Sequence, residues 1–478
     1  MWISLRYGCK RHNGAGRFRH CGACAPQPLH AKSNPEPVTD NAPDLQLAAL
    51  NNLGLMYANG QGVPQDFAQA LHCYQQAAER GAAQAQSNLA VMYSHGQGVA
   101  QDFVQARKWY GAAATQGLPY AQSNLAALYA NGQGGAVDFA QALHWYGAAA
   151  AQGDTTAQRN LGVMYANGQG VEQDFSQALA CYQTGAASGD PAAQYGLGVM
   201  YANGHGVPRD PAQAEHWYTL AAEQGHVHAQ FNLGFMFSSG QDGPLDPVRA
   251  VQWYSRAASA GDAAAQYNLG VMYSLGQGTA KDPKQALHWY LAAANQGDAA
   301  AQYNLGLMYA TGQDIEQDEA VALAWYQLAA DQGDALAQYN LGVMIANGQG
   351  TIASAEVAMQ WLQLAADQGD AQAQYDLGAL HQASTPPNYA QALACYRLAA
   401  AQGHADGQAA LGWLYANGAG VLQDFVRAHM WFNLGAVGGH AAAASGRDFV
   451  TQQMAPAQIA QAQDMARACQ KNQFKDFD

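Results

Sequence analysis

The sequence predicts an all-α fold, a right-handed α-solenoid of about eleven helix-loop-helix repeats. Two observations predict it: a Leu that recurs every 36 residues (Leu53 to Leu89, for example), and a Gly-x-Gly that follows it in nearly every copy. A fixed period in this range is typical of small helical units that stack on their neighbours and form one long surface. The Leu occurs at residues 53, 89, 125, 161, 197, 233, 269, 305, 341, 377 and 411, and only the last step is shortened, to 34.

The first half of each copy predicts a helix, as the copy around Leu269 illustrates. Asp262 is a good N-cap residue. Ala265, Leu269 and Met272 follow at a spacing of 4 and 3, which places them on one face of an α-helix. Gly276 then ends the helix.

The second half of the same copy predicts a second helix. Asp282 is its expected cap, and Pro283 stands in the first turn, where a helix tolerates proline. Ala286 and Tyr290 belong to its apolar stripe, and Gly297 ends it. The small residues let neighbouring helices approach closely, while the aromatic residues fill the space between them.

These motifs resemble the Sel1-like repeat, a relative of the tetratricopeptide repeat. The resemblance rests on Gln-Tyr-Asn-Leu-Gly-x-Met-Tyr-x-x-Gly-x-Gly (266–278), Ala-Leu-x-Trp-Tyr-x-x-Ala-Ala (286–294) and Gln-Gly-Asp (296–298), with their copies over roughly 50–440. It implies an adaptor or scaffold for protein complexes. A cysteine-rich subgroup of the family is associated with penicillin binding and β-lactam hydrolysis.

The resemblance also divides the chain. Residues 1–32 form a basic, Cys-containing leader that we expect to be disordered, and 33–44 form a Pro-rich linker. The repeat array covers 45–440, and a short tail covers 471–478. Arg447-Asp448 and the segment from Met454 resemble the helices that close many bacterial arrays, so 441–470 is predicted to be a cap. Its expected buried face is Phe449, Met454, Ile459 and Met465.

The charge distribution argues against a nucleic-acid partner. Residues 1–50 hold six Lys and Arg and three acids, so 51–478 hold 15 bases (21 − 6) and 32 acids (35 − 3), a net charge of −17. Nucleic-acid affinity begins with phosphate neutralisation, which an acidic array cannot supply. No apolar run approaches 18 residues, so no membrane span is predicted. No signal peptide is recognisable, which favours the cytoplasm, although export stays open if the start is misassigned.

The cysteines do not predict a catalytic or cofactor site. Cys21-x-x-Cys24 has some zinc character, but incidental cysteines in an unstructured leader are the favoured interpretation. Cys73, Cys181 and Cys395 occupy the position that is Trp in most copies, so we expect buried, unpaired thiols. No Ser-x-x-Lys occurs in the sequence. We therefore predict no catalytic residues, no cofactor and no metal site.

Four recurrent polar or glycine motifs are interpreted as structural. The Gly-x-Gly pairs follow a helix, whereas a phosphate-binding loop precedes one, so they are predicted to be turns. One second-helix position, expected to be exposed, holds His72, His144, His216 and His288. The recurrent Asn (Asn52 to Asn340) and Gln (Gln86 to Gln374) are expected to satisfy loop backbone groups in preference to a ligand.

One position predicts a binding surface. It precedes the recurrent Leu by two residues, about 200° away around the helix, so it points away from the core of its own repeat. By resemblance to tetratricopeptide arrays, the first helix lines the concave face. We call the six consecutive aromatic residues at this position the aromatic stripe: Tyr195, Phe231, Tyr267, Tyr303, Tyr339 and Tyr375. They either anchor a peptide or pack between neighbouring first helices.

Two classes of function therefore stay open. The leading one is a non-enzymatic scaffold or adaptor that binds a protein or peptide partner along the concave face. The alternative is a cell-wall-directed protein that binds or hydrolyses peptidoglycan-like or β-lactam ligands. The missing Ser-x-x-Lys and the absence of a cluster of acid, base and nucleophile favour the first.

Overall fold

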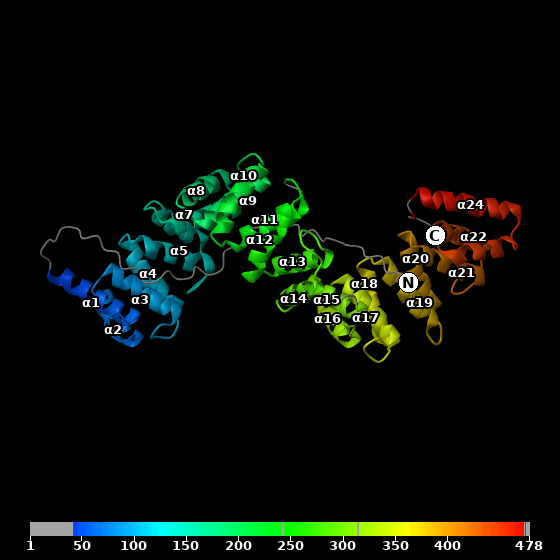
Figure 1. Ribbon diagram of the computed structural model, residues 1–478, viewed down its shortest axis with the longest axis horizontal. Coiled ribbons are helices and arrows are strands. Elements are labelled where there is room, and N and C mark those ends of the chain that lie inside the picture. The colour runs from blue at the N-terminus through cyan, green and yellow to red at the C-terminus, as the bar shows by residue number, and fades with distance from the viewer. Residues whose placement is uncertain (1–41, 241–242, 313–314, 473, 475–478) are drawn as a thin grey trace. The chain divides into compact units, whose positions relative to one another are not determined.

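The computed structural model describes residues 42–240, 243–312, 315–472 and 474. In these ranges the chain forms 24 α-helices and no β-strand, which confirms the predicted all-α repeat fold (Figure 1). The chain divides into two compact units, which meet in the sequence at Asp246 and Pro247. Unit 1 contains α1 to α11, and unit 2 contains α12 to α24. In each repeat that lies within one unit, a first helix and a second helix pack side by side.

Unit 1 begins with five complete helix pairs. Its first helices are α1 (Ala42–Asn59), α3 (Ala83–His95), α5 (Pro119–Asn131), α7 (Thr155–Asn167), α9 (Pro191–Asn203) and α11 (Val227–Ser239). Its second helices are α2 (Phe67–Glu79), α4 (Phe103–Thr115), α6 (Phe139–Ala150), α8 (Phe175–Ala187) and α10 (Pro211–Glu223).

Unit 2 begins with a second helix and ends in two additional helices. Its first helices are α13 (Ala263–Leu275), α15 (Ala299–Thr311), α17 (Ala335–Asn347), α19 (Ala371–Ala383) and α21 (Ala405–Asn417). Its second helices are α12 (Pro247–Ser259), α14 (Pro283–Ala294), α16 (Glu319–Asp331), α18 (Ala355–Asp367), α20 (Tyr389–Ala401) and α22 (Phe425–Val437), followed by α23 (Ala441–Thr451) and α24 (Pro456–Lys471).

Asp side chains start most helices, as the sequence predicted. Oδ1 of Asp262 accepts the backbone N–H of Ala265 at 2.8 Å, and Oδ1 of Asp282 accepts that of Gln285 at 3.1 Å. These bonds satisfy N–H groups that have no partner within the helix. Before α11, α21 and α23 a His replaces the Asp and caps through Nδ1: His226, His404 and His440.

The Gly-x-Gly segments are turns between the two helices. The first Gly ends the first helix in the left-handed conformation, as Gly96 does with φ 69°. The second Gly lies against the preceding repeat, where a Cβ atom on Gly98 would be only 2.6 Å from the Phe67 carbonyl oxygen. A side chain does not fit there, so the glycine allows close contact between successive repeats.

The core consists of similar layers, one for each repeat. The recurrent Leu is fully buried in most repeats, as Leu269 and Leu305 are, but Leu53 in the first repeat is 38% exposed. The Gly that follows the Leu lies on a buried second-helix Tyr: a Cβ on Gly270 would be 2.7 Å from Cδ1 of Tyr290. None of the helices described by the structure has the length and apolar character needed to cross a membrane.

The C-terminal helices α23 and α24 both pack on α22. Val450 and Cys469 are fully buried in the last core cluster, and Met454 and Met465 pack against it. Phe449 is 61% exposed, so its predicted place in the buried face is wrong. Consecutive helix residues point about 100° apart, and Val450 occupies the inward direction in its place.

Candidate interaction surface

The aromatic stripe lies on six first helices. Tyr195 and Phe231 belong to α9 and α11 in unit 1, and the other four rings belong to α13, α15, α17 and α19 in unit 2. All six side chains are half-buried. The stripe is therefore neither a row of core residues nor a row of freely exposed rings.

The inner edge of the stripe packs on buried tyrosines of the second helices. The ring centroid of Tyr267 lies 6.0 Å from that of Tyr290, and Tyr303 lies 5.8 Å from Tyr326. Tyr195 and Tyr375 make the same tilted contact with Tyr218 and Tyr396, at 5.8 and 5.7 Å. Each pair joins the two helices of one repeat, so the buried tyrosine holds the orientation of the stripe ring.

The outer edge of the stripe contacts the following repeat. Tyr195 stacks on the ring of His226 at 4.6 Å, and His226 is the N-cap residue of the next first helix. Tyr375 makes a similar contact with the cap residue His404, at 5.5 Å. Tyr195 and Tyr375 thus contact the following first helix, and both rings keep part of their surface in solvent.

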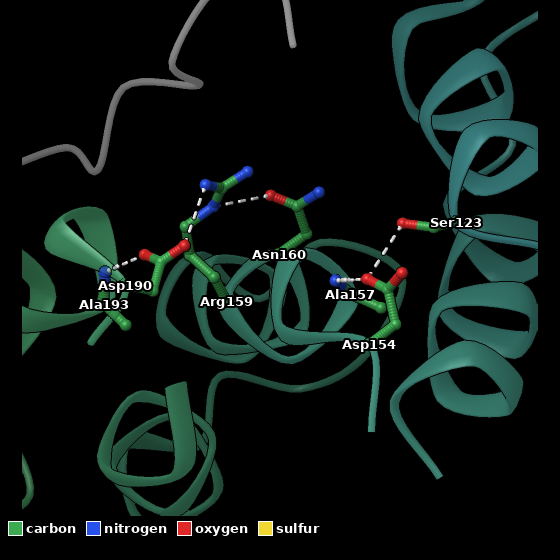
Figure 2. Close-up of polar contacts among 7 residues, drawn as sticks. All are labelled: Ser123, Asp154, Ala157, Arg159, Asn160, Asp190 and Ala193. Carbon is green, nitrogen blue, oxygen red and sulfur yellow. Dashed lines mark hydrogen bonds and ion pairs between the residues drawn. The ribbon is translucent and has the colours of Figure 1, made fainter. Parts of the chain in front are cut away.

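The same position makes polar contacts in the preceding repeats (Figure 2). Oγ of Ser123 donates to Oδ1 of Asp154 at 3.4 Å. Nη1 of Arg159 donates to Oδ2 of Asp190, also at 3.4 Å. Both acids are N-cap residues of the next first helix, each 31 residues further along the chain. The stripe position therefore contacts the cap of the next repeat whether it holds a ring, a hydroxyl or a guanidinium.

In the first three repeats the side chain at the stripe position is buried. Asn51, Ser87 and Ser123 are 7%, 0% and 6% exposed, and Nδ2 of Asn88 donates to Oδ1 of Asn51 at 2.9 Å. Sequence reasoning did not predict this burial or the contacts with the N-cap residues. The constant 31-residue offset between the position and the next Asp was the signal that could have revealed them.

Burial keeps the polar groups of the stripe uncharged. It raises the pKa of the Tyr303, Tyr339 and Tyr375 hydroxyls, which consequently stay protonated hydrogen-bond donors. Burial lowers the pKa of His226 to about 4, and the adjacent His228 acts in the same direction. The neutral ring of His226 can then accept the Ala229 N–H at 3.3 Å.

A buried row of glutamines, the glutamine ladder, ties neighbouring second helices together. Nε2 of Gln266 donates to the Ala258 carbonyl at 3.0 Å, and its Oε1 accepts from Nε2 of Gln296 at 2.8 Å. These glutamines satisfy backbone groups, as expected, but the carbonyls belong to the last turns of the second helices and not to loops. The same contacts recur at Gln86, Gln122, Gln302, Gln338 and Gln374.

The expectation for the asparagines is wrong where their partners are defined. Asn124 donates to the Tyr120 carbonyl within its own helix at 2.8 Å, and Asn88 bonds with the Asn51 side chain. These contacts lie on the first helices and not in the loops, because the Asn position is one residue away from the stripe on the helix surface.

The repeat units match a known family. The profile described as the Sel1 repeat matches eleven consecutive segments: residues 47–81, 83–118, 119–154, 155–190, 191–226, 227–262, 263–298, 299–334, 335–370, 371–404 and 405–440. The chain belongs to the Sel1 repeat family. No curated protein sequence gives a significant match.

Solved Sel1 repeat structures are similar along most of the chain. One is c5321, a protective antigen present in uropathogenic Escherichia coli strains, at 32% identity and a TM-score of 0.70. The match covers 90% of this chain and 93% of that one. A Sel1 repeat protein from Oxalobacter formigenes is 30% identical with a TM-score of 0.50, over 74% of this chain and 98% of that one.

The recurrent His and Cys positions differ in exposure. His72, His144, His216 and His288 are exposed on second helices, as predicted. Cys73 and Cys395 are buried free thiols, whereas Cys181 is only half-buried. Among the described residues no three His, Cys, Asp or Glu side chains form a group that could hold a metal ion. The possible zinc ligands Cys9, Cys21 and Cys24 lie outside the described residues.

Proposed function

We propose that this Sel1 repeat protein is a non-enzymatic scaffold that binds protein or peptide segments along its first-helix face. The observation that supports it is the half-exposed row of Tyr267, Tyr303, Tyr339 and Tyr375 on four successive first helices of unit 2. Tyrosines at interfaces supply large contact areas and often dominate binding energy. Because the row has one ring per repeat, it offers an extended partner segment one contact in each repeat.

The fixed orientation of these rings favours a role in partner binding over a role in packing alone. Tyr303 rests on Tyr326, and the hydroxyl of Tyr339 is bonded to Asp376 on the next first helix. Side chains that are already ordered lose little conformational entropy when a partner binds. The exposed part of each ring can then contribute its contact energy with little ordering cost.

The test uses substitutions that keep the inner packing. Replacing Tyr267 and Tyr303 with Leu retains an apolar contact with Tyr290 and Tyr326 but removes the aromatic surface. We expect partner capture from native lysate, identified by mass spectrometry, to fall by roughly tenfold or more. Thermal melts of the same variant report its folding, and Leu422→Gln, at a side chain that is 92% exposed, is the control.

Two results would oppose the proposal. The first is unchanged capture by the Leu variant, which would place the partner elsewhere. The second is loss of capture only in proportion to a lower melting temperature, which would assign the rings a purely structural role. The matching Ala substitutions cost more stability, because they also empty the contact with the buried tyrosines.

A further inference from the structure

A second surface of unit 2 has an unusual apolar character. Leu328, Leu364 and Leu398 occupy the same position in the last turns of α16, α18 and α20 and are 48%, 45% and 56% exposed. We call these three residues the leucine row. The two preceding repeats of unit 2 have Arg256 and Ala292 at this position, so the exposed leucines are confined to three successive repeats.

The glutamine ladder holds the last turns of α16 and α18 side by side. Nε2 of Gln368, the residue after α18, donates to the Gly333 carbonyl at 3.0 Å and to Oε1 of Gln338 at 2.8 Å. Gln338 in turn donates to the Ala330 carbonyl in the last turn of α16 at 3.1 Å. These bonds join the two helix ends that carry Leu328 and Leu364.

An equivalent set of bonds joins α18 to α20. Nε2 of Gln402 donates to Oε1 of Gln374 at 2.9 Å, and Gln374 donates to the Ala366 carbonyl in the last turn of α18 at 3.1 Å. The leucine row is therefore a series of three apolar side chains on helix ends that these hydrogen bonds join.

The apolar surface extends along the helices from each leucine. Trp325 precedes Leu328 by three residues, and Trp361 precedes Leu364 by the same interval. Residues three apart lie on one face of a helix, and both indoles are half-buried. On α18 the same face continues to Val357, which is 38% exposed.

Acidic side chains lie beside the first two leucines of the row. From Trp289 to Leu380 the sequence contains eleven Asp and Glu and no Lys, Arg or His, whereas Arg397 directly precedes Leu398. Asp331 and Asp367 are exposed and follow the leucines by three residues, in the last turns of their helices. Acids are unfavourable at this end of a helix, where the carbonyl groups already concentrate partial negative charge.

We propose that the leucine row is a docking surface for a cationic amphipathic helix of a partner protein. Residues seven apart lie on one face of such a helix, which gives it an apolar seam. Lys or Arg beside this apolar seam would meet Asp331 and Asp367. The row lies on second helices and the aromatic stripe on first helices, so this site is separate from the first-helix face proposed above. The same acids repel an anionic membrane surface.

The probe is a fluorescein-labelled synthetic helix of about 18 residues, with Leu on one face and Lys on the others. Fluorescence anisotropy with the full chain should detect binding that weakens as salt is raised. Leu328→Gln with Leu364→Gln and Leu398→Gln should lower the affinity by roughly tenfold or more. Gln occupies the same position naturally at Gln76, so the fold should tolerate the change.

Two further variants separate the contributions. Asp331→Asn with Asp367→Asn should weaken binding and flatten its dependence on salt, because the charged partners are removed. Leu422→Gln, which alters an exposed leucine outside the row, should leave binding unchanged. Tyr267→Leu with Tyr303→Leu should also leave binding of the synthetic helix unchanged. Failure of the proposal for the first-helix face and failure of this one are therefore distinguishable.

Several outcomes would overturn the proposal. Equal binding of a matched helix with Glu in place of Lys would remove the charge argument, and undiminished binding by the triple Gln variant would place the site elsewhere. Self-association of the wild-type chain in sedimentation experiments, abolished by the triple variant, would identify a second copy as the occupant. Flotation with anionic vesicles that depends on the row would identify a membrane in its place.

Discussion

The hydroxyl of Tyr339 donates a 3.0 Å hydrogen bond to Oδ2 of Asp376, 37 residues further along the chain. The bond joins the aromatic stripe on α17 to the next first helix, α19. Nε2 of Gln372 donates to the same carboxylate oxygen at 3.2 Å. Burial raises the pKa of Asp376, and these hydrogen bonds act in the opposite direction. The carboxylate is thus tied to the stripe in a partly desolvated position.

Asp376→Asn should change how stability depends on pH. The folded pKa of Asp376 lies above its ordinary value of 3.8, so the folded chain binds this proton more tightly than the unfolded chain. The contribution of Asp376 to stability therefore falls as pH rises from about 3.8 through the raised pKa, and the Asn variant lacks this contribution. Urea unfolding of both proteins should show a difference that grows in favour of the variant across this window and then stays constant.

The Asn side chain keeps an acceptor for the Tyr339 hydroxyl, and Asn304 and Asn340 occupy the same position in the preceding repeats. Their presence makes Asn a compatible substitute. A difference between variant and wild type that does not change with pH would contradict the assignment of this titration to Asp376.

Gln302→Met should destabilise unit 2 through the glutamine ladder. Gln302 is 4% exposed, donates to the Ala294 carbonyl at 3.2 Å and accepts from Nε2 of Gln332 at 2.7 Å. Met has a similar size but leaves both partners without this contact, and a buried unpaired group costs about 1–3 kcal/mol. Urea unfolding should show this loss, whereas Gln285→Met, at an exposed side chain on α14, should cost much less.

Gly98→Ala should be more harmful than Gly117→Ala. Both glycines have positive φ, 69° and 89°, so both substitutions share a backbone cost of about 1–2 kcal/mol. A Cβ on Gly98 would also be 2.6 Å from the Phe67 carbonyl oxygen, whereas a Cβ on Gly117 meets nothing within 4 Å. The additional loss at Gly98 should be about 1–3 kcal/mol. Equal melting temperatures for the two variants would contradict the proposed contact between repeats.

Val450→Asp and Phe449→Asp form a matched test of the C-terminal cap. Val450 is fully buried beside Cys469, whereas the neighbouring Phe449 is 61% exposed. An unpaired carboxylate at Val450 should cost about 3 kcal/mol or more, and the chain should then aggregate on heating. The Phe449 variant should melt like the wild type. Light scattering during thermal melts measures both, and a reversed order would show that α23 faces the other way.

The sequence alone predicted the repeated helix pairs, because their signals are local. The N-cap Asp262, the recurrent Leu269 and the turn at Gly276 each act within one or two helical turns, so the pattern specifies each helix without reference to the rest of the chain. The interpretation of the glutamines also followed from the sequence, since a buried amide next to helix ends needs backbone partners.

The contacts between repeats were less accessible to sequence reasoning. The side chain at the stripe position is half-buried at Tyr195 but buried at Ser123, although both residues precede the recurrent Leu by two. At the C-terminal end, helical periodicity could not distinguish Phe449 from Val450 as the inward residue. Both outcomes depend on side chains from another helix.

The sequence by itself therefore determined the period, the helix boundaries and the family of this protein. Only the tertiary structure decided that Arg159 pairs with Asp190, that Tyr195 stacks on His226, and that the compact units meet in the sequence after Asp246. The physical reason is the distance along the chain over which each kind of interaction acts. Helix propensity and capping act over a few neighbouring residues, whereas exposure and pairing depend on side chains that the next repeat supplies about 31 residues later.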